Sequence, residues 1–149
     1  MILFDVEADN LLEDATKIHC LSYTTDGSDY TTLFDYDEMR ELVLSQRGLI
    51  GHNIIRYDIP LLEKILDIKI TARLFDTLPM SWVLNYNRPR HGLESFGEDF
   101  GIPKPQITDW SSLSQEEYAH RCTEDVKINW QLWCNLLSRF VFIYKDKSE

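Results

Sequence analysis

The chain has 149 residues, of which 44% are hydrophobic, so it is long enough to bury the core of one domain. Acidic residues outnumber basic ones by 25 to 15, which gives a net charge of −10 and argues against broad coating of nucleic acid. Neither a membrane-spanning apolar run nor a signal peptide is recognisable, and the three cysteines lack metal-type spacing. We therefore expect a cytoplasmic protein with reduced thiols and no membrane partner.

Strands dominate the first third of the predicted structure. Apolar residues from Ile2 to Val6 indicate a first strand, and an antiparallel meander continues through Lys17–Thr25 and Tyr30–Phe34. Asp26-Gly27 is typical of the tight turn between the last two. A helix at 37–46 and a short buried strand at 48–51 follow.

Helices dominate the remainder. The expected elements are a helix at 56–65, a strand at 71–75, a helix from Asp76-Thr77 through Leu84, a helix at 93–100 ended by Gly101, and a final helix to about Phe142. Ser114 and Glu117 form a capping box before the final helix, and residues 143–149 are expected to be a frayed tail. The pattern predicts a single α/β domain over 1–149 with a mixed sheet and helices on its faces.

Asp5 and Glu7 interrupt the apolar first strand two residues apart. Residues i and i+2 of a strand point to the same side, so the two carboxylates are expected side by side. Like charges at short range repel and raise each other's pKa, which favours a cation between them. The alternatives from these residues alone are a metal site and two solvated acids at a strand end.

Two later stretches carry further polar candidates. Asp58 follows the His52-Asn53 pair at the predicted start of a helix, where an acid is also common for structural reasons. Asp125 lies near the start of the final helix, and His120 stands five residues before it. Each stretch is weak alone, since an exposed histidine is the default.

Together, these stretches resemble the DnaQ-like, or DEDD, superfamily of 3′–5′ exonucleases. The resemblance covers essentially the whole chain and is closest to the proofreading exonuclease domain at the N-terminus of podovirus-type phage family A DNA polymerases. It rests on the order of these motifs: Asp5-x-Glu7 with the residues to Glu13, Thr16–Cys20, His52-Asn53 with Tyr57-Asp58, Asp76–Leu78, His91–Gly97 with Gly101–Lys104, and Asp125 preceded by His120.

The resemblance implies a ribonuclease H-like fold, in which an antiparallel meander is followed by parallel strands with helices on both faces. It also implies two divalent ions, Mg²⁺ or Mn²⁺, which prefer carboxylate oxygens and water. Asp5, Glu7 and Asp125 would bind one ion. Asp5 would also hold the second, with Asp58 acting largely through water. Two such ions stabilise the attacking and leaving oxygens of a displacement at phosphorus.

The same superfamily needs a group that orients and deprotonates the attacking water. One version uses a tyrosine four residues before the last aspartate, and the other uses a histidine five residues before it. Here Arg121 occupies the first position and His120 the second, so the sequence fits the histidine version. Residues i and i+5 of a continuous helix differ by about 140°, so we expect a break near Cys122-Thr123. The alternative is that Arg121 faces the site and His120 is exposed.

Substrate contacts are also implied by the resemblance. The segment from Ala8 to Leu11 would meet the terminal nucleotide, with Leu11 as an apolar wedge, and Asn53 and Tyr57 would contact the adjacent sugar-phosphate. The alternatives are that Leu11 is core, Asn53 forms a turn and Tyr57 packs its helix. Basic candidates for phosphate contacts are Arg88, Arg90 and Lys104, unless they belong to solvated loops.

The resulting prediction is a metal-dependent 3′–5′ exonuclease that hydrolyses single-stranded or frayed DNA 3′ ends and releases nucleoside 5′-monophosphates. It would act either as a stand-alone proofreading subunit, with a separate DNA polymerase as a partner, or as an independent nuclease that trims DNA or RNA. Its location would be the host cytoplasm if it is phage-encoded. The alternatives are an exoribonuclease of the same superfamily and a non-catalytic adaptor for a polymerase.

Overall fold

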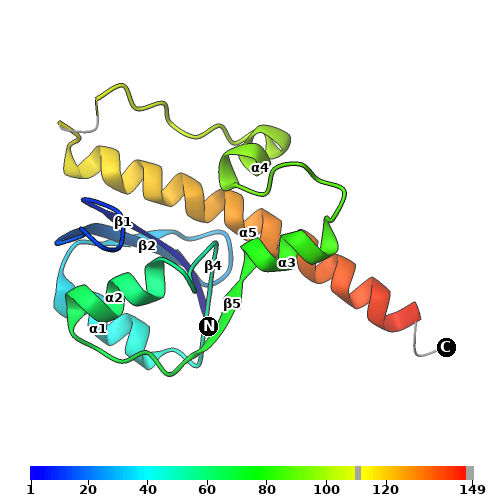
Figure 1. Ribbon diagram of the computed structural model, residues 1–149, viewed down its shortest axis with the longest axis horizontal. Coiled ribbons are helices and arrows are strands. Elements are labelled where there is room, and N and C mark those ends of the chain that lie inside the picture. The colour runs from blue at the N-terminus through cyan, green and yellow to red at the C-terminus, as the bar shows by residue number, and fades with distance from the viewer. Residues whose placement is uncertain (110–111, 147–149) are drawn as a thin grey trace.

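A five-stranded mixed sheet forms the centre of the protein (Figure 1), in a computed structural model that describes residues 1–109 and 112–146. The strands are β1 (Ile2–Ala8), β2 (Ile18–Thr24), β3 (Thr31–Leu33), β4 (Gly48–Gly51) and β5 (Arg73–Asp76). Their order is β3-β2-β1-β4-β5. The first three pair antiparallel, whereas β4 pairs parallel to both β1 and β5. The predicted fold class is confirmed.

Two helices cover one face of the sheet, α1 (Tyr36–Ser45) and α2 (Asp58–Leu66). Ile2, Phe4 and Val6 of β1 point to this face and join the buried residues of both helices in one core. The alternating burial follows from the two-residue period of a strand. Consequently Leu3, Asp5 and Glu7 point to the opposite face.

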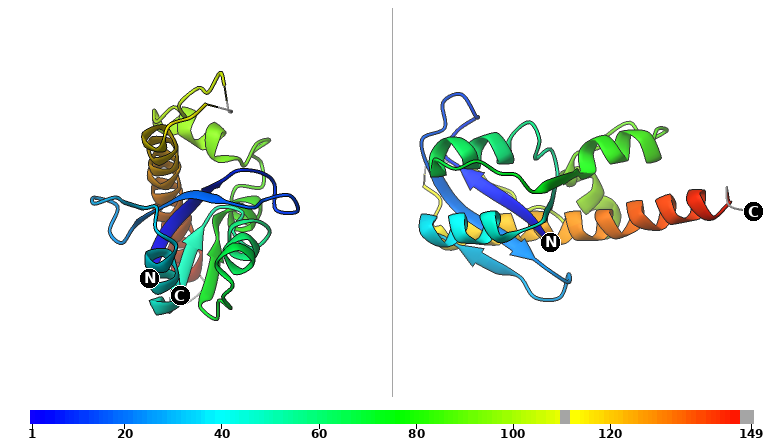
Figure 2. Two further views of the ribbon diagram at one scale, coloured as in Figure 1. Left: turned by 90° about the vertical axis from the view of Figure 1, so that its left-hand side faces the viewer. Right: turned by 90° about the horizontal axis from the view of Figure 1, so that it is seen from below.

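That opposite face is covered by α5 (Gln115–Asp146), and α3 (Thr77–Leu84) and α4 (Leu93–Phe100) pack beside it. Leu3 of β1 and Ile50 of β4 contact Val126 and Trp133 of α5. The two further views show α5 running across the sheet and its C-terminal end projecting beyond the rest of the chain (Figure 2). A sheet between two helical layers therefore brings β1 and the first half of α5 together.

The predicted capping residues are found at their helices. Asp76 accepts a hydrogen bond from Leu78 N at the start of α3, and Gly101 adopts a left-handed φ of 70° after α4. Ser114, just before α5, and Glu117, in its first turn, hydrogen-bond reciprocally, as the capping box requires.

One expectation about the last helix is wrong, because α5 is continuous from Gln115 to Asp146 and no break interrupts it near Cys122 and Thr123. Of the predicted tail at 143–149, residues 143–146 belong to α5, and residues 147–149 lie outside the described part. None of the described helices combines the length and apolar character needed to cross a bilayer.

Candidate active site

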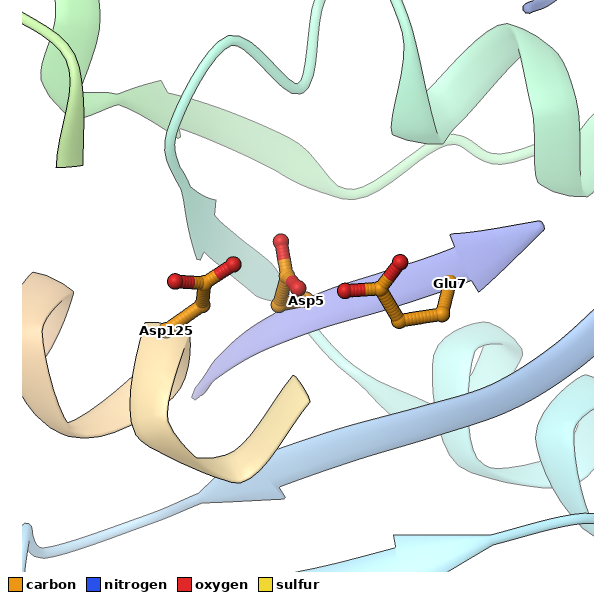
Figure 3. Close-up of side chains that lie close together, drawn as sticks. All are labelled: Asp5, Glu7 and Asp125. Atoms are coloured by element: carbon orange, nitrogen blue, oxygen red, sulfur yellow. The ribbon is translucent and has the colours of Figure 1, made fainter. Parts of the chain in front are cut away.

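Three carboxylates converge where β1 passes under α5. One oxygen each from Asp5, Glu7 and Asp125 lies within 4.8 Å of the others, and the three side chains point toward one another (Figure 3). Asp5 and Glu7 share the α5 side of β1, as the strand period requires, and Asp125 comes from the facing helix. We call these three residues the acid cluster.

Asp58 is the first residue of α2 and lies near the acid cluster, although it is not one of the three carboxylates within 4.8 Å. Pairing of β1 with β4 is recorded only at Ile2 and Leu3, so the strands diverge beyond that point. There the Asp58 carboxylate accepts a hydrogen bond from the backbone of Val6. Asp58 is only 3% exposed, and its Oδ1 atom has no hydrogen-bond partner among the described residues.

Burial and mutual repulsion make these acids difficult to ionise. Burial is the main reason that the pKa of Asp5 lies well above its ordinary value, and the charges of Asp125, Asp58 and Glu7 raise it further. Burial also raises the pKa of Glu7, of Asp125 and of Asp58, the last to about 8. A site of this kind stabilises any cation that enters it, because a cation relieves the repulsion.

Two basic side chains and one thiol already contact the acid cluster. Lys104 Nζ lies 3.0 Å from Asp125 Oδ1, and Arg121 Nε lies 2.9 Å from Glu7 Oε1. The buried Cys122 thiol donates to the Asp5 backbone carbonyl at 3.2 Å and lies 3.5 Å from Asp5 Oδ2. The sequence identified Lys104 only as a phosphate contact, and it gave no signal that Cys122 touches Asp5.

His120 does not join the acid cluster. Its side chain is exposed and lines a cavity of about 350 Å³ together with residues 105–109, 112 and 113. Because α5 is unbroken, the side chains of residues 120 and 125 point in directions about 140° apart. Arg121 stands one turn before Asp125 and faces Glu7 instead. The general-base role of His120 stays a prediction that this geometry does not favour.

Asp76 organises the segment that leads to Asp58. Besides capping α3, its carboxylate accepts hydrogen bonds from Asn53 N at 2.7 Å and Ile55 N at 3.1 Å. Asn53 is held at a φ of 62°, a left-handed conformation that asparagine tolerates better than most residues. The sequence indicated the cap, but not this second role.

The predicted substrate contacts gather at one end of β1. Ala8 is the last residue of that strand, and Leu11 in the following loop is 75% exposed, so it is not part of the core. The hydroxyl of Tyr57 donates to the carbonyl of Asn10 at 2.8 Å, which ties α2 to the same loop. Nucleotide binding by these residues, and by Asn53, stays a prediction.

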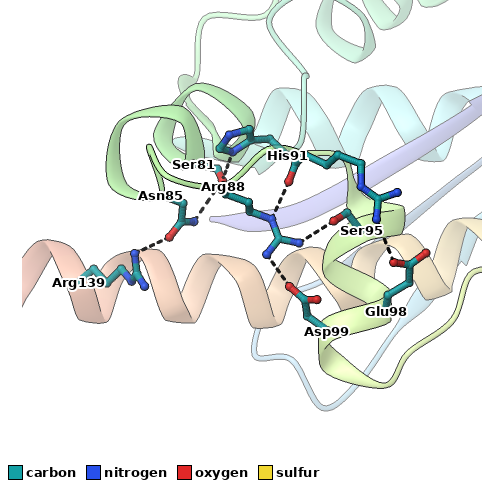
Figure 4. A network of polar contacts seen from close by, with 9 residues as sticks. Ser81, Asn85, Arg88, His91, Ser95, Glu98, Asp99 and Arg139 are labelled. Atoms are coloured by element: carbon teal, nitrogen blue, oxygen red, sulfur yellow. Dashed lines mark hydrogen bonds and ion pairs between the residues drawn. The ribbon is translucent and has the colours of Figure 1, made fainter.

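The basic loop before α4 is used within the protein. Arg88 pairs with Asp99, donates to Ser95 and lies over the ring of Phe96, as the contacts in Figure 4 show in part. Arg90 pairs with Glu98 at 3.4 Å. These contacts favour a structural role for the loop over the predicted phosphate contacts.

The donor set of the acid cluster fits a hard divalent cation. Carboxylate oxygens are the ligands that Mg²⁺ and Mn²⁺ prefer, and the cluster offers them from three residues. The unpartnered Oδ1 of Asp58 is a further buried acceptor nearby. No histidine or cysteine belongs to the cluster among the described residues, which disfavours zinc.

This fold and the position of its acids define a ribonuclease H-like architecture, and the solved structures with a similar fold include Exonuclease X and RNase D. NrnC of Brucella melitensis aligns with 99% of this chain and 76% of its own, with a TM-score of 0.74 and 19% identity. It has also been solved with bound Mg²⁺ and bound to pGG. RNase D of Escherichia coli, an exoribonuclease, aligns with 93% of this chain and 39% of its own, with a TM-score of 0.66 and 15% identity.

Among curated proteins, the DNA-directed DNA polymerases of Escherichia phage T7 and Enterobacteria phage T3 are each 31% identical to this chain over 101 residues. The match covers 58% of this chain but only 14% of either polymerase. No family model matches the sequence. The predicted resemblance to DnaQ-like exonucleases is confirmed, and the similarity to phage polymerases concerns one part of those enzymes.

Proposed function

We propose that the protein is a metal-dependent 3′–5′ exonuclease that removes nucleoside 5′-monophosphates from nucleic acid 3′ ends. The observation that carries the proposal is the acid cluster, in which Asp5, Glu7 and Asp125 offer oxygens within 4.8 Å of one another. Buried acids without a shared cation repel, so the cluster is better explained by a ligand than by stability. The similarity to exonucleases in fold supports the reaction class.

Asp5, Glu7 and Asp125 would hold divalent ions, with Asp58 nearby. When bound, such ions neutralise charge on the phosphodiester and lower the pKa of an attacking water. The residues of the chain contribute position: β1 and α5 fix three of the carboxylates from two rigid elements, and Asp76 fixes the turn before α2. Leu11 lies in the loop after β1 and Tyr57 contacts the same loop, where the terminal nucleotide would lie.

DNA is the proposed substrate, because the curated relatives are DNA polymerases. RNA is the second candidate, since RNase D and the pGG-bound NrnC share the fold. Association with a separate DNA polymerase rests on the relatives alone and stays a prediction, as does a cytoplasmic location.

The test is digestion of matched DNA and RNA oligomers labelled at the 5′ end, with Mn²⁺, with Mg²⁺ and with EDTA. We expect stepwise shortening of the DNA that EDTA stops, and a loss of at least about 10³-fold in Asp125→Asn. Asp67→Asn makes the same chemical change at an exposed left-handed position after α2 and should retain activity. If only RNA is shortened, the substrate is RNA and the DNA proposal is wrong. If no metal-dependent cleavage occurs, the result supports the alternative of a non-catalytic adaptor for a polymerase.

A further inference from the structure

Two cationic side chains from different segments contact the acid cluster. Lys104 lies in the loop after α4 and pairs with Asp125 at 3.0 Å, while Arg121 of α5 pairs with Glu7 at 2.9 Å. Both are mostly buried, with side-chain exposures of 26% and 20%. We propose that Lys104 and Arg121 compete with divalent cations for the carboxylate oxygens of the acid cluster, so that metal binding displaces both ion pairs. The inference rests on the proposed function, since it concerns the same metal site.

The two pairs compensate the cluster in the absence of metal. Three carboxylates within 4.8 Å would otherwise face each other with little water to screen them. The charge of Arg121 opposes the rise in the pKa of Glu7, and that of Lys104 opposes the rise for Asp125. Each cation contacts a different acid of the cluster, and the charge of each also acts on the other acid. Together they reduce the repulsion within the cluster when no ion is bound.

A divalent ion needs the same atoms. Mg²⁺ binds carboxylate oxygens at about 2.0–2.1 Å, and Glu7 Oε1 and Asp125 Oδ1 are the oxygens nearest the two cations. An ammonium or guanidinium kept about 3 Å from a metal-bound oxygen would lie a few ångströms from a doubly charged ion, and like charges repel. We therefore expect the metal ion to replace Lys104 and Arg121 at these oxygens. The two positively charged side chains would then lie close to the place where a phosphate would bind.

The exchange does not require the sheet to move. Arg121 reaches Glu7 from α5 through a long, flexible side chain, so a different Arg121 rotamer would separate this pair while α5 stays in place. Lys104 belongs to the stretch 102–109 after α4, in which the backbone is not part of a helix or strand. Both carboxylates meanwhile stay on β1 and α5.

The experiment is calorimetric titration of Mn²⁺ into the metal-free protein and into Arg121→Gln and Lys104→Gln. Removing either competitor should tighten Mn²⁺ binding on the order of tenfold. Lys69→Gln is the control, because it removes the same charge from an exposed pair with Glu63. Unchanged or weaker affinity in both variants would overturn the inference while leaving the metal site intact. Absence of Mn²⁺ binding to the unsubstituted protein would instead contradict the proposed function, and the inference with it.

A second measurement uses the unsubstituted protein and does not depend on how the variants fold. The Nε–H group of Arg121 gives its own nitrogen-15 NMR signal, which should shift or broaden as Mg²⁺ saturates the site. The Nε–H signal of Arg40, which donates to the carbonyl of Leu66 from α1, should stay constant. A signal of Arg121 that does not change at saturating Mg²⁺ would show that the pair with Glu7 survives metal binding.

Discussion

Individual acids in this protein are placed where they cost stability. Asp58 is 3% exposed and has a pKa near 8, and Asp5 is surrounded by three other carboxylates that raise its pKa. Such unfavourable electrostatics is typical of functional sites, where a bound ligand relieves the repulsion that is present in the free protein. The contacts of Lys104 and Arg121 moderate this repulsion without removing it.

His52 is a buried group whose titration should be visible in stability. The hydroxyl of Thr77 donates its hydrogen to Asn129 Oδ1 or to the Gly51 carbonyl, so it can only accept from His52. The Nδ1–H of His52 is therefore the donor to Thr77. Burial lowers the pKa of His52 from 6.5 to about 4, and the charge of Asp76 opposes only part of this effect. A histidine with a depressed pKa binds fewer protons folded than unfolded, so stability is lost as the pH falls from 6.5 toward 4.

We predict that the free energy of unfolding falls by about 2–3 kcal/mol more in the unsubstituted protein than in His52→Asn between pH 7 and pH 4.5. Urea unfolding in metal-free buffer at pH 7 and at pH 4.5 measures the difference. Both proteins contain the same acids, so the contribution of these acids to the pH dependence cancels in the comparison. Equal losses would mean that the pKa of His52 is not lowered in the folded protein.

At the scale of elements, the packing of α5 decides how the site is assembled. It supplies Asp125 and Arg121 to one face of β1, and α4 holds its middle through Ile128 and Leu132. Gly97 makes that contact close. A Cβ at this position would lie 2.5 Å from the carbonyl of Ile102 and 2.8 Å from Ile128 Cδ1.

Gly97→Ala should therefore destabilise the protein by about 1–2 kcal/mol, even though alanine gains about 1 kcal/mol in helix propensity. The steric term wins because one of the clashing atoms belongs to the backbone. Gly92→Ala is the steric control, since nothing lies within 4 Å of its added Cβ, and it should lose only the smaller preference of the α4 N-cap for glycine over alanine. Thermal unfolding of both variants measures the difference, and a Gly97→Ala protein as stable as the control would contradict it.

Local patterns predicted most elements, and their limits are physical. The two-residue period of β1 placed Asp5 and Glu7 together, and the caps at Asp76, Gly101 and Ser114 depend on neighbouring residues only. The choice between His120 and Arg121 depends on the rotation of α5 against the sheet. That rotation is set by Val126 and Trp133 packing on β1 and β4, contacts that a single sequence does not reveal.

At the scale of the whole molecule, the net charge of −10 limits how the protein can hold nucleic acid. Few basic side chains lie near the acid cluster, and Arg88 and Arg90 pair with acids of α4. The protein should therefore bind only the terminal nucleotides of a nucleic acid, through metal ions and a few side-chain contacts. It should not bind the phosphate backbone over a long stretch.

The dependence of kcat/KM on salt tests this expectation. With about two phosphates neutralised on a single strand, the logarithm of kcat/KM against that of the KCl concentration should have a slope near −1.4. The slope is measured at saturating Mg²⁺ with one oligomer. A slope steeper than about −4 would require an extended basic surface that the charge distribution does not provide.

The divalent metal site proposed between β1 and α5 is tested most directly by anomalous diffraction from a crystal soaked in Mn²⁺. We predict a Mn²⁺ peak between the carboxylates of Asp5, Glu7 and Asp125, with a second near Asp5 on the side of Asp58. A well-diffracting crystal in which Mn²⁺ is absent from the acid cluster, with Lys104 and Arg121 still paired to Asp125 and Glu7, would contradict the claim.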